Sequence, residues 1–365
     1  MTTPAGGSPP GRGHGVRSFD ELMARQADAA IALSGAHHSS WRRGQLGPTR
    51  KVDRGIVLGT ADWDGTLRYD HGEVVKPLRE MFARQGRQLA AEDLVRYRSA
   101  LLVVLHENTH MLAPEGRDNG DREDRDTPLS PDAARMALEE GATEAWAYRN
   151  LDRYIDELGL EDVAPGLNSV TAISRYQHYL PAADILAERI GERSGAGRDE
   201  LLRQLNCELS DRKWRVVTEH LYQSSNLPEL VPPGDVRRVR GELNQAMRAA
   251  FSSLTDLETM MPVRSRATQS AALGEAAYYE GLRAVARIEE RYRSGTPVQQ
   301  DRQAEQGTQP QGQPEQKDAL DVALSGTVSA GRATATRPGQ AKLNKAPANP
   351  QRQNGGAREP GQADR

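Results

Sequence analysis

Apolar side chains recur at three- and four-residue steps through most of the central part of the chain, which is the spacing of one helix face. Ser18, with Glu21 three residues later, matches a capping box and predicts the start of the first helix. The segments expected to be helical are 19–34, 78–82, 91–112, 131–158, 170–190, 201–221, 235–254 and 269–292. This pattern predicts a mostly helical fold.

One stretch between the first two helical segments departs from this spacing. Residues 55–60 and 66–69 predict two short strands, and the Asp64-Gly65 pair between them is a turn signal that predicts a hairpin. Residues 73–76, Glu-Val-Val-Lys, are expected to form a third short strand. The predicted fold class is therefore α+β, mostly helical, with a small β-sheet.

Both ends of the chain lack the large apolar residues that a packed core needs. Residues 1–17 are rich in glycine, proline and serine, and residues 295–365 consist mainly of Gln, Pro, Gly, Ala, Arg and Asp. Such segments bury too little apolar surface to offset the entropy lost on folding. Disordered termini are therefore predicted.

Composition narrows the classes of function. With 37% hydrophobic residues the 365-residue chain can build a core, and a net charge of -3 gives no electrostatic case for nucleic acid or an anionic membrane. Cys207 is the only cysteine in the sequence, so an intrachain disulfide and a thiolate zinc cluster are both excluded. A transition-metal site in this chain must use histidine, aspartate and glutamate.

Targeting signals are also missing from the sequence. The N-terminus has no basic start followed by an apolar stretch, which argues against a secretory signal peptide. No run of about 18 apolar residues predicts a transmembrane helix. A cytoplasmic location is expected, with signal-independent export left open.

The sequence His106-Glu107-Asn108-Thr109-His110 follows an apolar run in the predicted helix 91–112. Residues four apart on a helix lie one above the other on the same face, so the two imidazoles can bind one zinc ion. The intervening Glu107 can then reach the water on that ion, which is the arrangement of an H-E-x-x-H metallopeptidase motif.

A catalytic zinc takes three protein ligands and keeps one position for water. Because no further cysteine or nearby histidine is present, the third ligand is expected to be a carboxylate from a later helix. The segment 138–146 offers Glu139, Glu140 and Glu144. Glu140 and Glu144 share a helix face, whereas Glu139 points about 100° away. A solvated helix face is the alternative interpretation of Glu139 and Glu144.

An H-E-x-x-H helix followed by a second helix with E-E-G-A-T-E resembles the gluzincin class of zinc metallopeptidases, which includes aminopeptidases and bacterial collagenases. The resemblance implies that Glu140 is the third zinc ligand and that Glu144 orients a zinc histidine. It also implies that Gly141 lets the two helices approach closely. It covers about residues 55–190, including a strand segment that in zincins forms the edge on which the peptide lies.

Two features depart from that class. The 29 residues between His110 and Glu140 are more than the aminopeptidases have, and the excess is a charged loop at 115–130. The aminopeptidase G-x-M-E-N motif is also absent. The expected domains are a zincin-like metallopeptidase domain at 18–190 and a helical C-terminal subdomain at 191–294, between the disordered ends.

The resemblance implies hydrolysis of peptide bonds through a zinc-activated water, with Glu107 as general base. The oxyanion needs a further donor, and Tyr176 resembles the tyrosine that follows this helix in many bacterial gluzincin-like proteins. Tyr179 and His178 remain alternatives, and a packing role is the other interpretation of each of these three residues. The expected partner is a peptide or protein substrate. The alternative function is a non-enzymatic interaction or structural protein that retains a zincin scaffold. Cleavage specificity and oligomeric state are left open.

Overall fold

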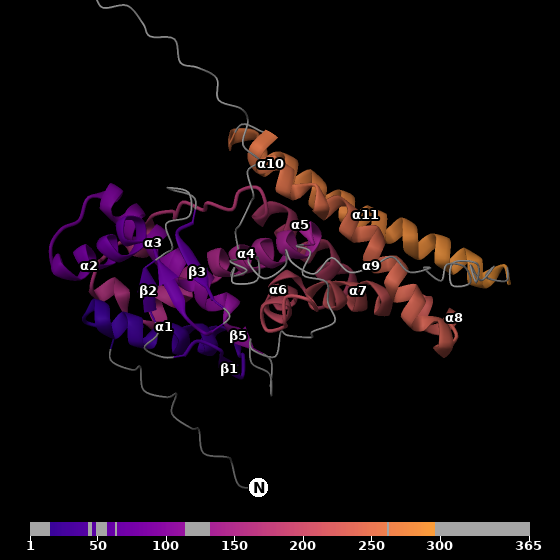
Figure 1. Cartoon of the computed structure of the whole chain (residues 1–365), viewed down its shortest axis with the longest axis horizontal. Helices are drawn as coiled ribbons and strands as arrows, with labels where there is room; N and C mark the ends of the chain where they lie inside the picture. Colours follow the sequence, from indigo (N-terminus) through magenta and orange to yellow (C-terminus); the bar gives the residue numbers. More distant parts are fainter. Residues whose placement is uncertain are drawn as a thin grey trace, which may run out of the picture. The chain divides into compact units, whose positions relative to one another are not determined.

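The computed structural model describes residues 15–42, 46–48, 57–62, 64–113, 132–260 and 263–295 (Figure 1). The chain divides into two compact units, 1–332 and 333–365, and all the described residues belong to the first. The charged loop at 115–130 and the termini before residue 15 and after residue 295 lie outside the described residues. At the N-terminal end Val16 is buried, and its N–H donates to the Leu158 carbonyl at 2.9 Å.

Helices make up most of the described structure, which confirms the mostly helical prediction. The α-helices are α1 (Phe19–Ser34), α2 (Lys76–Ala83), α3 (Ala91–His110), α4 (Ala133–Glu157), α5 (Leu180–Ser194), α6 (Arg198–Asn206), α7 (Lys213–Gln223), α8 (Leu227–Leu230), α9 (Val236–Ser252), α10 (Leu254–Met260) and α11 (Val263–Arg293). As predicted, the Ser18 side chain caps α1 by accepting from the Glu21 N–H at 3.1 Å.

The strands are short and form two small sheets. They are β1 (His38–Ser39), β2 (Leu46–Pro48), β3 (Gly59–Ala61), β4 (Leu67–Tyr69) and β5 (Leu112–Ala113). β3 and β4 form the predicted hairpin, antiparallel with Thr60 opposite Arg68, and Gly65 in the turn has a φ of 79°. β2 pairs with β4 in parallel and β1 pairs with β5, so β3 lies at an edge of its described sheet.

The third strand predicted at 73–76 is wrong. A π-helical turn, His71–Val75, occupies this stretch and continues into α2. The Asp70 side chain accepts from the N–H groups of Gly72 at 2.9 Å and Glu73 at 2.8 Å, which caps a helix start. Pro77 lies in the first turn of α2, where its missing N–H costs nothing.

Three predicted helix boundaries are also corrected. The segment 170–179 is irregular, and α5 begins only at Leu180, with Pro181 in its first turn. The predicted helix 201–221 is broken between α6 and α7. α4 begins at Ala133 rather than at 131, because the Asp132 carboxylate, rather than Ser130, caps it by accepting from the Ala134 N–H at 3.1 Å.

Helix α4 lies between the N-terminal elements and the later helices, and it packs against α3, α5, α6, α7 and α9 (Figure 1). Gly141 does not serve the contact with α3 that was expected of it. A side chain there would lie 2.8 Å from both the Tyr179 carbonyl and the Ala183 side chain, so the glycine admits the start of α5. The predicted domain boundary at residue 190 falls within α5.

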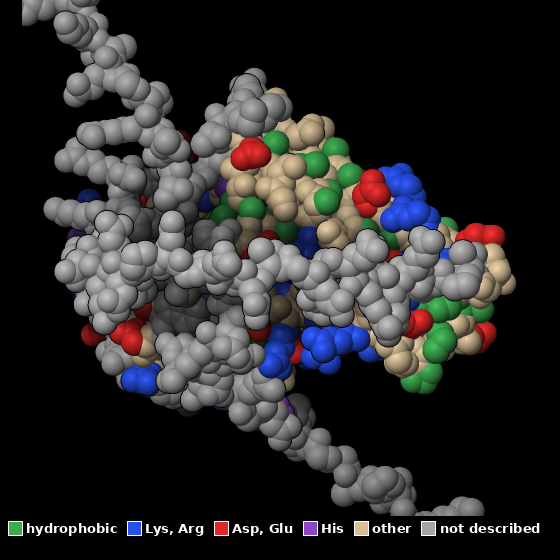
Figure 2. Space-filling view, turned by 45° about the vertical axis from the view of Figure 1, so that its right-hand side comes forward, with side chains coloured by type: hydrophobic (Ala, Val, Ile, Leu, Met, Phe, Trp, Pro, Cys, Tyr) green, Lys and Arg blue, Asp and Glu red, His purple; other side chains and the backbone are tan. Residues whose placement is uncertain are grey.

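The surface shown in Figure 2 carries Lys/Arg and Asp/Glu side chains interspersed over the described helices rather than one large patch of either sign. Among these helices are ion pairs such as Arg291 with Glu242 at 3.0 Å and Arg240 with Glu219 at 2.7 Å. In the described part of the chain, no helix combines the length and apolarity needed to cross a membrane.

Candidate metal centre

Helix α3 carries the two histidines of the motif on a buried face. His106 is 1% exposed and His110 is 5% exposed. Their rings meet edge to face, with centroids 4.8 Å apart, and their Nε2 atoms are 3.1 Å apart. The four-residue spacing therefore places two imidazole nitrogens at a common point, as helix geometry requires.

A buried polar cluster fixes α3 in the fold. The Asn108 amide, between the two histidines, donates to Gln26 on α1 at 3.0 Å and to the Val104 carbonyl at 2.8 Å. The Tyr69 hydroxyl on β4 donates to the same Gln26 oxygen at 2.6 Å. Buried polar groups that are satisfied in this way rigidify the elements that share them.

Glu140 on α4 completes a triangle of ligand atoms. Its Oε2 lies 3.4 Å from His106 Nε2 and 3.7 Å from His110 Nε2. Tetrahedral zinc with ligands at about 2.0–2.1 Å separates those ligands by about 3.3 Å, close to the three distances seen here. Neither oxygen of Glu140 has a hydrogen-bond partner in the described part of the chain. These three buried residues could therefore hold a metal ion.

The other nitrogen of each imidazole contacts a second carboxylate. His106 Nδ1 lies 2.8 Å from Glu144 Oε2, and His110 Nδ1 lies 2.7 Å from Glu139 Oε1. A carboxylate at Nδ1 accepts the ring N–H and leaves the Nε2 lone pair facing Glu140. The structure thus brings the predicted residues His106, His110, Glu140 and Glu144 together, and neither Glu139 nor Glu144 is on a solvated helix face.

The role of Glu139 is the main site feature that the sequence reasoning missed. The helix-face argument pointed Glu139 away from Glu140, but that argument considered only one histidine. His110 lies one turn beyond His106 on α3. A side chain on a different face of α4, that of Glu139, therefore contacts it. The available signal was chemical: two ligating histidines need two acceptors at Nδ1, and Glu144 supplies only one.

Glu139 also connects the site to α7. Its Oε2 lies 3.0 Å from the Lys213 ammonium, which lies 3.1 Å from Asn206 Oδ1. Lys213 is only 2% exposed, although it is a lysine. The local sequence around Lys213 carries no feature that distinguishes it from a surface lysine.

Glu107 lies buried beside the histidines, and its Oε2 has no hydrogen-bond partner in the described structure. Burial raises the pKa of Glu107 to about 7, against the opposing attraction of His106 and His110. The edge strand β3 presses against this side chain. A Cβ added to Gly59 would lie 2.5 Å from Glu107 Cγ and 2.6 Å from its Oε1, so only glycine fits there without displacing Glu107.

The ligand set has shifted pKa values that reflect mutual attraction in a buried site. Burial alone raises the pKa of the Glu140 carboxyl, but the adjacent His110 and His106 outweigh burial and bring it to about 2. Burial likewise opposes protonation of His106, yet Glu140, Glu144 and Glu107 raise its pKa well above the ordinary value. In the absence of a metal ion, a proton on the histidines serves as the counter-charge to the carboxylates.

Tyr176 covers the site from the irregular segment 170–179. Its ring stacks on the His106 ring, with centroids 4.6 Å apart and planes 8° apart. Burial, with Glu140 and Glu107, raises the pKa of the Tyr176 hydroxyl well above its ordinary value, so it stays a hydrogen-bond donor. The segment lies against α3, because the Ile173 N–H donates to Ser99 Oγ on that helix at 2.9 Å.

The two alternatives to Tyr176 occupy different positions. Tyr179 is buried at the start of α5, with its carbonyl against Gly141 and its ring 3.9 Å from that of His178. Burial and the charge of Arg266 lower the pKa of His178 to about 4, while Glu140 opposes this shift. Tyr176 has a ring contact to a potential metal ligand, His106.

A small cavity, called here the metal-site cavity, opens onto His106 and Glu107 between β3, α3 and the segment 170–179. It is lined by Leu58, Gly59, Leu102, Val103, His106, Glu107, Glu144, Ile173, Arg175 and Tyr176. Ile173 is 57% exposed at this site, and Arg175 lies 3.6 Å from Glu73. The cavity is therefore largely apolar, with the motif side chains and a tyrosine in its wall.

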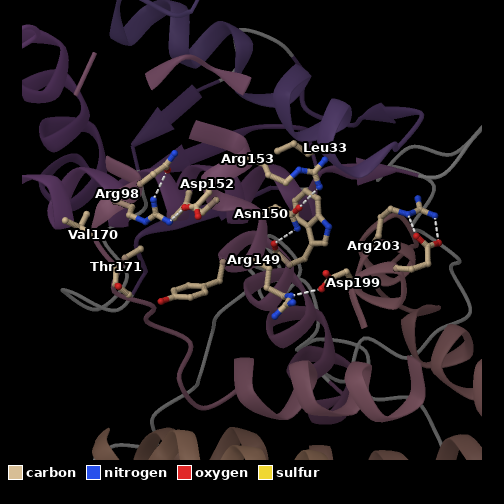
Figure 3. Close-up of a pocket in the computed structure, with 16 residues that line it drawn as sticks. Leu33, Arg98, Arg149, Asn150, Asp152, Arg153, Val170, Thr171, Asp199 and Arg203 are labelled. Carbon is tan, nitrogen blue, oxygen red and sulfur yellow. Dashed lines mark hydrogen bonds and ion pairs between the residues drawn. The ribbon is translucent and has the colours of Figure 1, made fainter. Parts of the chain in front are cut away.

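A second, larger cavity borders the C-terminal half of α4, and we call it the arginine cavity (Figure 3). Arg98 contacts Asp152, Arg149 lies 2.7 Å from Asp199, and Arg203 lies 2.7 Å from Glu200. A fourth arginine, Arg153, donates to Asn150 at 3.2 Å. None of the three potential metal ligands lines this cavity.

Comparisons of the chain with protein-family models, with curated proteins and with solved structures give no match. The functional argument therefore rests on the arrangement of the residues themselves.

Proposed function

We propose that the protein is a zinc-dependent metallopeptidase of the gluzincin type, built on a zincin-like fold. One observation carries the proposal. His106 Nε2, His110 Nε2 and Glu140 Oε2 converge within 3.7 Å of one another, while both Nδ1 atoms are bound by carboxylates. A set of two imidazoles and one carboxylate, with no thiolate, is the ligand set of a catalytic zinc site.

When bound, zinc would polarise the substrate carbonyl and lower the pKa of water. The protein supplies the groups that move protons. Glu107 accepts a proton from the attacking water and passes it to the leaving amine, which matches a buried carboxyl with a pKa near neutrality. Gly59 keeps Glu107 in place, because any larger residue at that position would displace its carboxylate.

Two further features support a peptide substrate. The protonated hydroxyl of Tyr176, held over His106, is a donor for the oxyanion that forms at the attacked carbonyl. β3 is the edge strand of its described sheet and runs beside Glu107, so its outer backbone groups can pair with an extended peptide. Both features support a peptide substrate bound beside the proposed general base.

The test is cleavage of a peptide library by the full-length, zinc-loaded protein, with products read by mass spectrometry. We expect Glu107→Gln to retain zinc and to lose cleavage by about 10²- to 10⁴-fold, since it removes only the general base. Glu92→Gln, at an exposed position in the first turn of the same helix α3, is the matched control and keeps full activity.

Zinc binding without cleavage of any peptide or protein library would favour the non-enzymatic scaffold over the peptidase. No specific feature of the described structure favours that function, whereas the buried Glu107 beside the histidines and the stacking of Tyr176 on His106 support the peptidase.

A further inference from the structure

Lys213, the first residue of α7, is a buried cation. Its side chain is 3% exposed. Moving an ammonium group out of water is costly unless partners compensate it, so a lysine in this position is kept by its contacts. Those contacts lead to the metal centre.

The polar groups around Lys213 are held in fixed orientations. Asn206 donates through Nδ2 to the carbonyls of Ala142 and Leu202, both at 2.9 Å, which turns its Oδ1 towards the lysine. Oδ1 then accepts from Lys213 at 3.1 Å and from Thr143 at 3.3 Å. The same ammonium group forms an ion pair with Glu139, with Nζ 3.0 Å from Oε2.

Glu139 bridges this lysine and a proposed metal ligand. One carboxylate oxygen contacts Lys213 and the other contacts His110 Nδ1 at 2.7 Å. The carboxylate that contacts the other histidine, His106, differs in this respect. No ion pair in the described structure joins Glu144 to a lysine or arginine. Among the described residues, Lys213 is the one buried lysine beside the four buried carboxylates of the site, which are Glu107, Glu139, Glu140 and Glu144.

We propose that Lys213 is a positioning residue for metal binding, acting on His110 through Glu139; this inference rests on the proposed metal site. The ammonium holds Glu139 in place as a carboxylate acceptor, which keeps the proton of His110 on Nδ1 and the lone pair on Nε2. Without it, the Glu139 carboxylate loses the buried cation beside Oε2 and is held less firmly against the imidazole. His110 can then adopt the tautomer with a proton on Nε2, in which Nε2 has no lone pair for a metal ion.

The inference gives α7, which lies far from α3 and α4 in the sequence, a role in the proposed metal centre. It predicts that the zinc affinity of α3 and α4 residues depends on α7, although no residue of α7 belongs to the ligand set. Residues that orient metal ligands in this way typically change metal affinity by about 10- to 100-fold when replaced.

The experiment measures the zinc affinity of the full-length protein by competition with a chromogenic chelator. Lys213→Met keeps an unbranched side chain, one atom shorter, and removes its charge, and we expect a 10- to 100-fold loss of zinc affinity. Lys76→Met, at an exposed lysine of α2, is the matched control and leaves zinc affinity unchanged.

A second comparison separates positioning from general stability. Because Lys213 acts through Glu139, adding Lys213→Met to Glu139→Gln changes zinc affinity less than twofold. A purely structural role for Lys213 predicts the same loss in both backgrounds and would overturn the inference. Should Lys213→Met fail to fold, the double variant lacks both charges and still provides the comparison with Glu139→Gln.

The two proposals fail in different ways. Wild-type protein that binds no zinc would overturn the proposed function. Wild-type protein that binds zinc, together with Lys213→Met of equal affinity, would overturn the role of Lys213 and leave the metal site standing.

Discussion

The metal-site cavity and the arginine cavity both border α4, but their charged groups are paired differently. In the arginine cavity Arg98, Arg149 and Arg203 each contact a carboxylate, so three of its four arginines are paired within the protein (Figure 3). In the metal site, both oxygens of Glu140 and one oxygen of Glu107 are buried with no hydrogen-bond partner among the described residues.

The difference singles out the group of His106, His110 and Glu140 as one that could hold a metal ion. Leaving a buried polar group unpaired costs about 1–3 kcal/mol or more, so native proteins seldom leave several such groups in one place. The Nε2 atoms of His106 and His110 lie 3.1 Å apart, a hydrogen-bond distance, at the point where Glu140 Oε2 also converges. The size of a cavity is a poorer guide, because the larger of these two has three of its four arginines already paired with carboxylates.

The largest expected effect is on stability when zinc is removed or restored. Free zinc at about 100 times its dissociation constant should stabilise the metal-stripped protein by about 2.7 kcal/mol, because a ligand that binds only the folded state shifts unfolding by mass action. Urea denaturation with and without zinc measures this. Glu140→Gln should abolish the zinc-dependent gain, whereas Arg149→Gln in the arginine cavity should retain it. Equal zinc-dependent increases in unfolding free energy in both variants would contradict the comparison.

The arginine cavity should respond to mutation through stability alone. Arg98 is buried and donates to the Leu167 carbonyl at 2.9 Å, to Asn168 at 3.1 Å and to Asp152. Arg98→Met should therefore destabilise the protein by about 2 kcal/mol, in the range for hydrogen bonds to charged groups. Its zinc stoichiometry should equal that of the wild type. A loss of zinc from this variant would show that the two cavities are not independent.

A smaller effect is expected where β3 meets Glu107. Gly59→Ala should displace the Glu107 carboxylate and slow cleavage by about tenfold, equivalent to about 1.4 kcal/mol, with zinc retained. Peptide hydrolysis and metal analysis of the same sample measure the two quantities. Gly241→Ala in α9, where an added Cβ meets nothing within 4 Å, is the control. It should leave hydrolysis unchanged and raise stability by about 0.5–1 kcal/mol.

The smallest effect concerns pH and the arginine cavity. Hydrogen bonds from Arg203 lower the pKa of Glu200 from 4.5 to about 2, although burial opposes the shift. A lowered carboxyl pKa stabilises the fold above pH 4.5, and this contribution is lost as pH falls towards 2. Both side chains are more than a third exposed, so Glu200→Gln should cost only about 0.5 kcal/mol at pH 7. Urea denaturation should show that the difference in unfolding free energy between the wild type and Glu200→Gln is smaller at pH 3 than at pH 7. A difference that stays constant with pH would contradict the prediction.

The elements that the sequence predicts best are those defined by local spacing. α1, α3 and α9 follow their apolar periodicity, and the hairpin of β3 and β4 follows its Asp64-Gly65 turn. The errors have local causes that compete with periodicity. Asp70 and Asp132 start helices through their side chains, and Pro181 marks a helix start where the apolar pattern had suggested continuation.

The metal centre shows the limit of such reasoning more clearly. His106, Glu107 and His110 are local, and Glu140 and Glu144 follow from a motif on the next long helix. The contact of Glu139 with His110, and that of Lys213 with Glu139, depend on how α3, α4 and α7 pack. Contacts between helices far apart in sequence leave no periodic signal in any one of them.

Anomalous scattering at the zinc absorption edge, from crystals of the full-length protein grown with zinc, tests the central claim most directly. We predict a single peak at about 2.0–2.1 Å from His106 Nε2, His110 Nε2 and a carboxylate oxygen of Glu140. A peak bound by other residues, or no peak at these three in zinc-saturated crystals, would contradict the proposed metal centre.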